Sequence, residues 1–211
     1  MSAKEIHQEV LTKKAGELFP LFKKLENFYL VGGTALALQI GHRISVDFDF
    51  FSDKELPTSL LLKIKRIFSD SKIEVIYKES RQQITLTLDG VKMTFFYYPY
   101  PFIDNFVKYQ GVPISTIREI AAMKAFSIGK RLSYKDYIDW YFLLSGKYVN
   151  LQQVIKLADK KFNGDFNARL FLGQLVSMAD VPAQKIDFIH SEVSRETVEK
   201  FLIDAVRNFK I

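Results

Sequence analysis

Val-Asp-Phe-Asp-Phe, at residues 46–50, is the stretch that says most about how this chain folds. Apolar and acidic residues alternate in it, which is the period-two pattern of a half-buried strand over about 46–51. The apolar side chains would face one side of that strand, and Asp47 and Asp49 the other. The rise of a strand then puts the two carboxylates about 7 Å apart.

Carboxylates at that spacing are candidate metal ligands. Both can reach one or two hard cations, and Mg²⁺ typically takes one or two protein carboxylates and completes its shell with water and substrate phosphates. The pattern has two other interpretations. An edge strand with a polar outer face looks the same, and D-x-D motifs also occur in metal-dependent glycosyltransferases. The residues that precede the strand favour the metal-binding interpretation.

A glycine pair precedes the acidic strand. Residues 28–31 form a short apolar run that predicts a strand, and helix formers follow at 34–39. Small residues between them would let a phosphate approach the backbone N–H groups, and the helix N-terminus adds a favourable partial charge. A glycine turn for phosphate and a carboxylate strand for Mg²⁺ within 18 residues predict a nucleotide–metal site. The candidate nucleotide-binding residues here are Gly32, Gly33, Thr34 and Ser45.

Away from this site, the rest of the chain divides into two parts. The first part is mixed, with helices predicted at 4–26 and 57–68 and strands at 73–77, 83–88 and 91–98. Asp89-Gly90 joins the last two strands as a hairpin turn. After Pro113 the pattern is almost entirely helical. We therefore expect an α+β fold, with a mixed half at about 1–104 and an all-helical half at about 110–211.

A helix predicted at 117–131 carries Lys124 in the middle of an apolar stripe and Arg131 at its edge. The two side chains could simply extend to solvent along a partly buried face. They could instead bind triphosphate oxygens. A buried ammonium needs an anionic partner. The candidate partners are Asp47, Asp49, Asp136 and Asp139.

The next predicted helix, 135–145, is apolar nearly all round and is therefore expected to be buried. Asp136 and Asp139 lie three residues apart in it and face the same way. Acids in a first helical turn are also stabilised by the helix dipole, so a structural role competes with a functional one, above all for Asp136.

Composition narrows the class of protein. The chain has 211 residues, 48% of them hydrophobic, with 19 Phe and no Cys. Disulfides, thiolate metal sites and cysteine nucleophiles are thereby excluded. No apolar run approaches the ~18 residues of a membrane span, and the first residues lack the pattern of a signal peptide, so we expect a cytoplasmic protein with no membrane partner. The net charge of +6 and the pI near 9.3 favour a polyanionic partner.

Residues 29–38 (Tyr-Leu-Val-Gly-Gly-Thr-Ala-Leu-Ala-Leu) and 41–51 (Gly-His-Arg-Ile-Ser-Val-Asp-Phe-Asp-Phe-Phe) together resemble the first motif of AbiEii/MenT-type nucleotidyltransferases. These are toxins of bacterial toxin–antitoxin and abortive-infection systems, within the DNA polymerase β-like superfamily. The resemblance implies a polymerase β-like core with a small mixed sheet, and a helical half that completes the cleft. It also implies Mg²⁺, or Mn²⁺ in its place, as cofactor. The implied partners are a nucleoside triphosphate, the 3′ end of tRNA as acceptor, and an antitoxin.

The resemblance also covers 117–144, where the family has a lysine in a helix, a following basic residue and a D-x-x-D helix. It implies that Lys124 binds the phosphates and that Asp136 or Asp139 has an essential acidic role. The catalytic residues would be Asp47, Asp49, Lys124, Asp136 and Asp139, with Lys124 and Arg131 among the nucleotide-binding residues.

The chain departs from the wider superfamily in one respect. The predicted strand at 91–97 contains no acid where many relatives place a third metal carboxylate, which leaves two-metal geometry open. Two other functions stay open as well. One is a non-catalytic nucleotide- or RNA-binding module of the same fold, and the other is transfer to a protein or small-molecule hydroxyl.

Overall fold

The computed structural model describes residues 6–210. The chain forms two compact units that divide between Thr116 and Ile117. The predicted change from mixed to helical structure lay between residues 104 and 110. Two short strands that have no clear signal in the sequence account for the later division. No helix in the described range is long and apolar enough to cross a membrane.

The N-terminal unit contains a sheet of seven strands and the helices that surround it. Its helical elements are η1 (Gln8–Val10), α1 (Lys13–Leu18), η2 (Phe19–Lys24), α2 (Gly32–Ile40) and α3 (Leu60–Ile67). Its strands are β1 (Tyr29–Val31), β2 (Phe48–Ser52), β3 (Ile73–Glu79), β4 (Gln83–Leu88), β5 (Val91–Tyr97), β6 (Val107–Tyr109) and β7 (Val112–Ile114).

The sheet is mixed, with strand order β3-β4-β5-β2-β1-β7-β6. The β2 strand lies near its middle, antiparallel to β1 and parallel to β5. The predicted hairpin is confirmed, because β4 and β5 pair antiparallel and Asp89 and Gly90 both have positive φ. With a helical unit following this mixed sheet, the predicted α+β class is confirmed.

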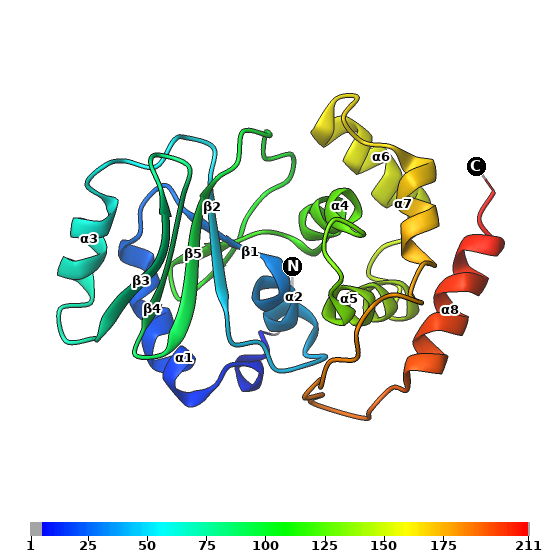
Figure 1. The fold of residues 1–211 in the computed structure, drawn as a ribbon, viewed down its shortest axis with the longest axis horizontal. Coiled ribbons are helices and arrows are strands. Elements are labelled where there is room, and N and C mark those ends of the chain that lie inside the picture. Colours follow the sequence, from blue (N-terminus) through cyan, green and yellow to red (C-terminus); the bar gives the residue numbers. More distant parts are fainter. Residues whose placement is uncertain (1–5, 211) are drawn as a thin grey trace. The chain divides into compact units, whose positions relative to one another are not determined.

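The two faces of the sheet carry different side chains. Phe48 and Phe50 point into a core that Phe19, Phe22 and Phe68 complete, with ring centroids 4.7–6.1 Å apart in the pairs that link β2 to η2. Alternation places Asp49 and Phe51 on the opposite face. Figure 1 shows α3 and α2 on different sides of the strands. The acidic residues therefore belong to the face away from this phenylalanine core.

The prediction of one continuous helix at the start of the chain is wrong. Residues 4–26 were expected to form one helix, but the described part is divided into η1, α1 and η2. Pro20 occupies the first turn of η2, where its missing N–H and fixed φ are tolerated but the α-helix behind it cannot continue. The acidic strand is also shorter than predicted. It begins at Phe48, so Asp47 directly precedes it.

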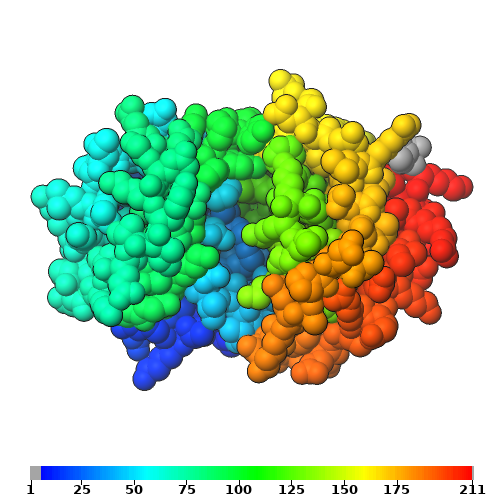
Figure 2. Space-filling model, in the orientation of Figure 1, coloured from blue at the N-terminus to red at the C-terminus, as the bar shows by residue number. Residues whose placement is uncertain are grey.

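The C-terminal unit is built from helices. They are α4 (Ile117–Ser127), α5 (Tyr134–Ser145), α6 (Leu151–Phe162), α7 (Ala168–Leu175) and α8 (Arg195–Arg207). Trp140, Tyr137 and Phe171 are among its most deeply buried side chains. In the space-filling view, α8 and the extended segment before it, in red and orange, form one outer side of this unit (Figure 2).

The predicted helix 117–131 ends early. The α4 helix stops at Ser127, and Gly129 has a φ of +80°, a conformation that glycine adopts without strain. Arg131 therefore lies in the turn after α4 and not on its edge. The prediction for α5 is better, because that helix is buried on most sides and is followed by Gly146 as expected.

Candidate active site

The glycine pair forms the first turn of α2 and does not precede the helix as a separate loop. Gly32 has a φ of +74°, and a Cβ placed on it would lie 2.8 Å from Oδ2 of Asp49. Backbone conformation and space therefore both require glycine there. The side chain of Asp49 consequently lies against the N-terminus of α2, where the helix dipole stabilises negative charge.

Two hydroxyls connect this helix to the segment before β2. Thr34 Oγ1 and Ser45 Oγ are 2.7 Å apart, and both residues are buried. The Thr34 hydroxyl also hydrogen-bonds the backbone carbonyl of Asp47. The structure thus brings together the predicted nucleotide-binding residues Thr34 and Ser45 beside the glycine pair. These contacts fix the backbone at the position where Asp47 leaves it.

Arg43 is a residue that the sequence interpretation did not select. Its side chain is buried, and a Cβ at Gly33 would lie 2.5 Å from Nη2 of Arg43 and 3.7 Å from Oγ of Ser45. Its Nη1 donates to the carbonyl of Ile44 at 3.1 Å. A guanidinium against the first turn of a helix adds positive charge where the backbone N–H groups already favour anions. The Gly-His-Arg turn at 41–43 was the signal that could have identified it.

Asp47 and Asp49 are both partly exposed, whereas Phe48 and Phe50 beside them are buried. Among the described residues no group of three or more His, Asp or Glu side chains could hold a metal ion. The candidate metal ligands are therefore the two carboxylates of Asp47 and Asp49, and Mg²⁺ usually takes only one or two protein carboxylates. Hard carboxylate oxygens also fit Mn²⁺.

The missing third carboxylate is explained by the register of the sheet. Asp49 pairs with Thr94 on β5, so a neutral hydroxyl occupies the neighbouring position on that face. Asp89, the nearest acid in sequence, lies in the hairpin turn. Its carboxylate accepts from Lys14 Nζ at 2.9 Å and from the backbone N–H of Lys72 at 2.7 Å. The carboxylate of Asp89 thus stabilises the hairpin turn and is not a candidate metal ligand.

The other predicted residues cluster in the C-terminal unit. Lys124 Nζ lies 2.7 Å from Oδ1 of Asp136 and 2.6 Å from Oδ2 of Asp139, so it joins α4 to α5. Arg131 binds Asp136 through two hydrogen bonds, from Nε at 2.8 Å and Nη2 at 2.9 Å. Two carboxylates and two cations therefore form one cluster, in which Lys124, Asp136 and Asp139 are buried.

The pKa values in this cluster follow from those contacts. Burial by itself would lower the pKa of Lys124, but the carboxylates of Asp139 and Asp136 outweigh it and hold the pKa above its usual value. Burial would raise the pKa of Asp136, and Lys124 and Arg131 together hold it below its usual value instead. Lys124 and Asp136 are therefore both ionised at neutral pH.

The fold and these groups define a class of protein. A glycine pair at a helix N-terminus beside D-x-D on a mixed sheet, with a helical second unit, is the arrangement of a nucleotidyltransferase. Residues 17–207 match the family model of the nucleotidyl transferase AbiEii toxin of type IV toxin–antitoxin systems. The chain belongs to this AbiEii family of nucleotidyltransferase toxins, as its sequence motifs predicted.

The chain is also similar to one protein in sequence and to solved structures in fold. An uncharacterized protein of Aquifex aeolicus (strain VF5) is 36% identical over 186 residues, which cover 87% of this chain and 88% of that protein. Solved structures share the fold at lower identity. A Helicobacter pylori protein described as a nucleotidyltransferase matches with a TM-score of 0.58 and 18% identity, covering 95% of this chain and 92% of its own. MenT4, a nucleotidyltransferase toxin of Mycobacterium tuberculosis H37Rv, matches with a TM-score of 0.53 and 12% identity, covering 97% and 88%.

Proposed function

We propose that this nucleotidyltransferase moves a nucleoside monophosphate from a Mg²⁺-bound nucleoside triphosphate to the 3′ end of an RNA, with tRNA as the candidate acceptor and pyrophosphate as the product. The observation that carries the proposal is the first turn of α2. There the glycine backbone, the paired hydroxyls of Thr34 and Ser45 and the carboxylate of Asp49 meet within one short segment.

Each group of the N-terminal unit has a role in this proposal. The backbone of Gly32 and Gly33 and the side chains of Thr34 and Ser45 would bind the β- and γ-phosphates at the helix N-terminus. Arg43 would add a guanidinium to the same phosphates. Asp47 and Asp49 would hold Mg²⁺, or Mn²⁺, which supplies charge neutralisation on the transferring phosphoryl group when bound.

The C-terminal unit would contribute Lys124 and Arg131, whose positive charge would stabilise the leaving pyrophosphate. Lys124 would then exchange a carboxylate for a phosphate oxygen as its partner. Asp136 and Asp139 would hold Lys124 in place until that exchange, and Asp139 would serve as the essential acid of the D-x-x-D helix. In this proposal the N-terminal unit supplies the nucleotidyltransferase core, and the helical unit completes the set of reacting groups.

The test uses Asp47→Asn and Asp49→Asn, with Asp53→Asn as the matched control. Asp53 is an exposed acid just after β2, so its loss should leave the metal pair intact. Each of the four labelled nucleoside triphosphates is incubated with total tRNA or with lysate, with Mg²⁺, Mn²⁺ or chelator. Pyrophosphate release and labelling of RNA are measured.

We expect transfer by the parent and by Asp53→Asn, and a loss of about a thousandfold or more, about 4 kcal/mol, in both metal-pair variants. Full activity of both variants would overturn the metal assignment. Transfer of the labelled nucleotide to a protein or to a small molecule would show that the acceptor is not RNA. Nucleotide binding without pyrophosphate release would identify a non-catalytic module.

An antitoxin is the further partner that membership of a type IV toxin–antitoxin family suggests. We propose that expression of the parent chain alone arrests growth of a bacterial host, and that Asp49→Asn does not. Rescue of growth by a gene co-expressed from the same operon would identify that partner.

A further inference from the structure

A row of aromatic side chains lies beside Asp49 on the same face of the sheet. The register pairs Phe51 of β2 with Tyr29 of β1 on one side and with Phe96 of β5 on the other. Phe51 follows Asp49 by two residues and therefore shares its face. The aromatic row consequently runs across three neighbouring strands, about 7 Å along β2 from the carboxylate.

Tyr29 is buried at its end of the row, but the rings on the β5 side are only partly buried. Phe51 lies 5.5 Å from Phe96 and 4.7 Å from Tyr98 between ring centroids, and Tyr98 lies 5.2 Å from Tyr100. These four side chains all keep partial exposure. On the other face, Phe50 and Phe95 are stacked and at most 1% exposed. The hydrophobic core on the far side of the sheet is thus formed without Phe51, Phe96 and Tyr98.

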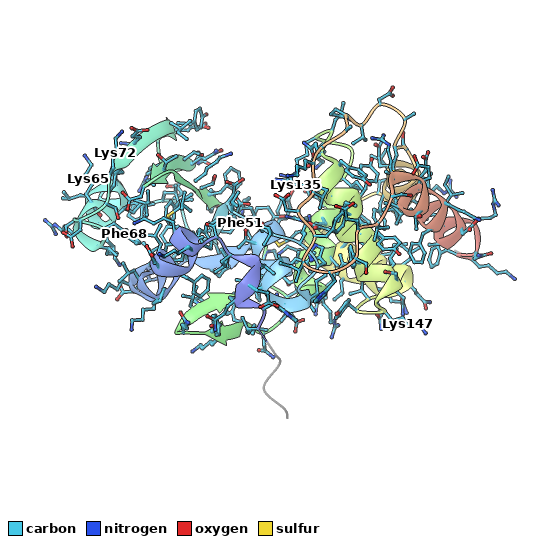
Figure 3. The ribbon with its side chains drawn as sticks, turned by 90° about the horizontal axis from the view of Figure 1, so that it is seen from below. Phe51, Lys65, Phe68, Lys72, Lys135 and Lys147 are labelled. Atoms are coloured by element: carbon cyan, nitrogen blue, oxygen red, sulfur yellow. The ribbon has the colours of Figure 1, made fainter. Side chains whose placement is uncertain are left out.

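Figure 3 labels one phenylalanine of the core, Phe68, and one of the aromatic row, Phe51. Phe68, which directly follows α3, packs on Phe22 in the core. Phe51 lies well apart from it in this view. Large partly exposed aromatic groups on one surface are typical of sites that bind another molecule. Their proximity to Asp49 makes that molecule a participant in the reaction.

The direction of β2 indicates which participant it is. Along the chain the order is Ser45, Asp47, Asp49 and Phe51, and β2 begins at Phe48. The hydroxyl of Ser45 and the first turn of α2 mark the end where phosphates would bind. The aromatic row lies at the opposite end, beyond Asp49, and this end is left for the molecule that receives the nucleotide.

The polar neighbour of the row is an amide. Gln83 of β4 pairs with Phe96, and its side-chain N–H donates to the Thr85 hydroxyl at 3.0 Å. Lys92, which is exposed on the same face of β5, lies toward the other end of that strand, because its neighbour Met93 pairs with Phe48. Aromatic rings beside an amide are a usual means of holding single-stranded nucleic acid, because every base can stack.

We infer that Phe51, Phe96 and Tyr98 form a stacking surface for the unpaired bases at the 3′ end of an RNA acceptor. Stacking there would place the terminal hydroxyl beside Asp49, where the incoming nucleotide is attacked. This inference rests on the proposed transferase function. It adds that the acceptor is recognised by its single-stranded bases on the face of the sheet.

The test measures binding of a single-stranded oligoadenylate that carries a fluorescent label at its 5′ end. Fluorescence anisotropy in the presence of Mg²⁺ gives the affinity. Phe51→Leu and Phe96→Leu remove a ring but keep apolar volume. We expect each to weaken binding about tenfold. Tyr98→Phe keeps its ring and should bind as the parent does. Tyr148→Leu is the matched control, because it removes an exposed aromatic ring from the other unit.

Phe51→Trp gives a second readout. Trp140 is the chain's one tryptophan and is buried, so the emission that the variant adds to that of the parent reports on the stacking surface. Quenching of its emission by the oligonucleotide, with parent-like affinity, is expected. An oligonucleotide with abasic 3′-terminal positions should bind the parent more weakly, and Phe51→Leu should weaken its binding no further. Circular dichroism and melting curves confirm that each variant is folded.

The outcomes separate this inference from the transferase proposal. Unchanged oligonucleotide affinity and unchanged acceptor KM in both leucine variants, with transfer intact in the parent, would overturn the stacking surface alone. A loss confined to the KM for the nucleoside triphosphate would assign the rings to the incoming base and overturn the acceptor assignment. Ring-dependent RNA binding by a parent that releases no pyrophosphate would support the surface and refute the transferase proposal.

Discussion

Two lysines are buried in the C-terminal unit, and their surroundings differ. Lys124 lies between the carboxylates of Asp136 and Asp139. Lys161, on α6, pairs with Glu119 of α4 at 2.6 Å. The pKa of Lys124 is raised by its two acids, whereas burial lowers the pKa of Lys161 in spite of Glu119. The carboxylates around Lys124 thus more than offset the effect of burial on its pKa, whereas Glu119 does not fully offset it for Lys161.

The accessibility of the two groups also differs. Lys161 and Glu119 have fully buried side chains, so their pair ties α4 to α6 inside the core. The Lys124 cluster reaches solvent through Arg131, whose side chain is 63% exposed. Lys124 and Glu119 lie five residues apart on α4 and therefore point about 140° apart around it. One helix thus carries both an ion pair enclosed in the core and a buried cluster whose Arg131 is open to solvent.

The largest expected effect is on stability, from Lys161→Met. The variant leaves Glu119 buried without its cation, which should lower the free energy of unfolding by about 3–5 kcal/mol. Urea unfolding followed by the fluorescence of Trp140 measures this, because that residue lies in the same unit. The double variant Lys161→Met/Glu119→Leu should recover most of the loss and should retain transfer activity. A single variant as stable as the parent would show that the pair is not structural.

Lys124→Met should instead act mainly on activity. Transfer should fall about a hundredfold or more, as when a preorganised electrostatic contact is lost. The variant should also be less stable than the parent, because Asp136 and Asp139 would both remain buried without Lys124.

Lys124→Met/Asp136→Asn/Asp139→Asn sharpens this comparison. Neutralising the stranded carboxylates should restore stability toward that of the parent while transfer stays low. Pyrophosphate release at saturating nucleotide, together with urea unfolding, gives both values. Intact transfer in Lys124→Met would make the lysine structural, like Lys161.

A smaller effect should appear in the pH dependence of unfolding. The pKa of Asp136 is lowered in the folded protein, so its contribution is present above its unfolded pKa of about 4. That contribution is lost as pH falls through the folded value. Asp136→Asn should therefore lose less stability than the parent between about pH 4 and pH 2. Equal acid slopes for the two proteins would contradict the ion-pair assignment.

The two lysines should give opposite effects in alkali. The raised pKa of Lys124 means that its contribution is lost only as pH rises through a value above 10.5. The lowered pKa of Lys161 means that its amine loses its proton in the folded state first, which relatively stabilises the fold as pH approaches 10.5. Unfolding curves of the parent and of Lys161→Met/Glu119→Leu on the alkaline limb test this difference.

The smallest effect is expected from Arg131→Lys. The charge remains, but the two parallel hydrogen bonds to Asp136 are lost. Since the side chain is largely exposed, stability should change by about 1 kcal/mol or less. A larger fall in transfer than in stability would support a role for Arg131 with phosphate. The loss of transfer relative to the loss of stability in Arg131→Lys should be compared with the same ratio in Lys124→Met.

The sequence by itself determined the elements whose signals are local. The alternation at 46–50, the glycine pair and the Asp89-Gly90 turn predicted β2, the start of α2 and the hairpin, because periodicity and turn chemistry depend on neighbouring residues. The alternation selected Asp47 and Asp49 as candidate site residues, and the apolar stripe of the predicted helix 117–131 selected Lys124. Their roles in transfer remain predictions for the experiments above.

Only the tertiary structure decided the contacts between distant segments. The β6 and β7 strands have three residues each, too few to show a period, and they form by pairing with one another and with β1. Arg43 lies against Gly33, and Lys161 meets Glu119, through packing between elements that no spacing in the sequence reveals. The aromatic row is of the same kind. Tyr29, Phe51 and Phe96 become neighbours only when three strands pair in one register, since a shift of one residue would turn each ring to the other face.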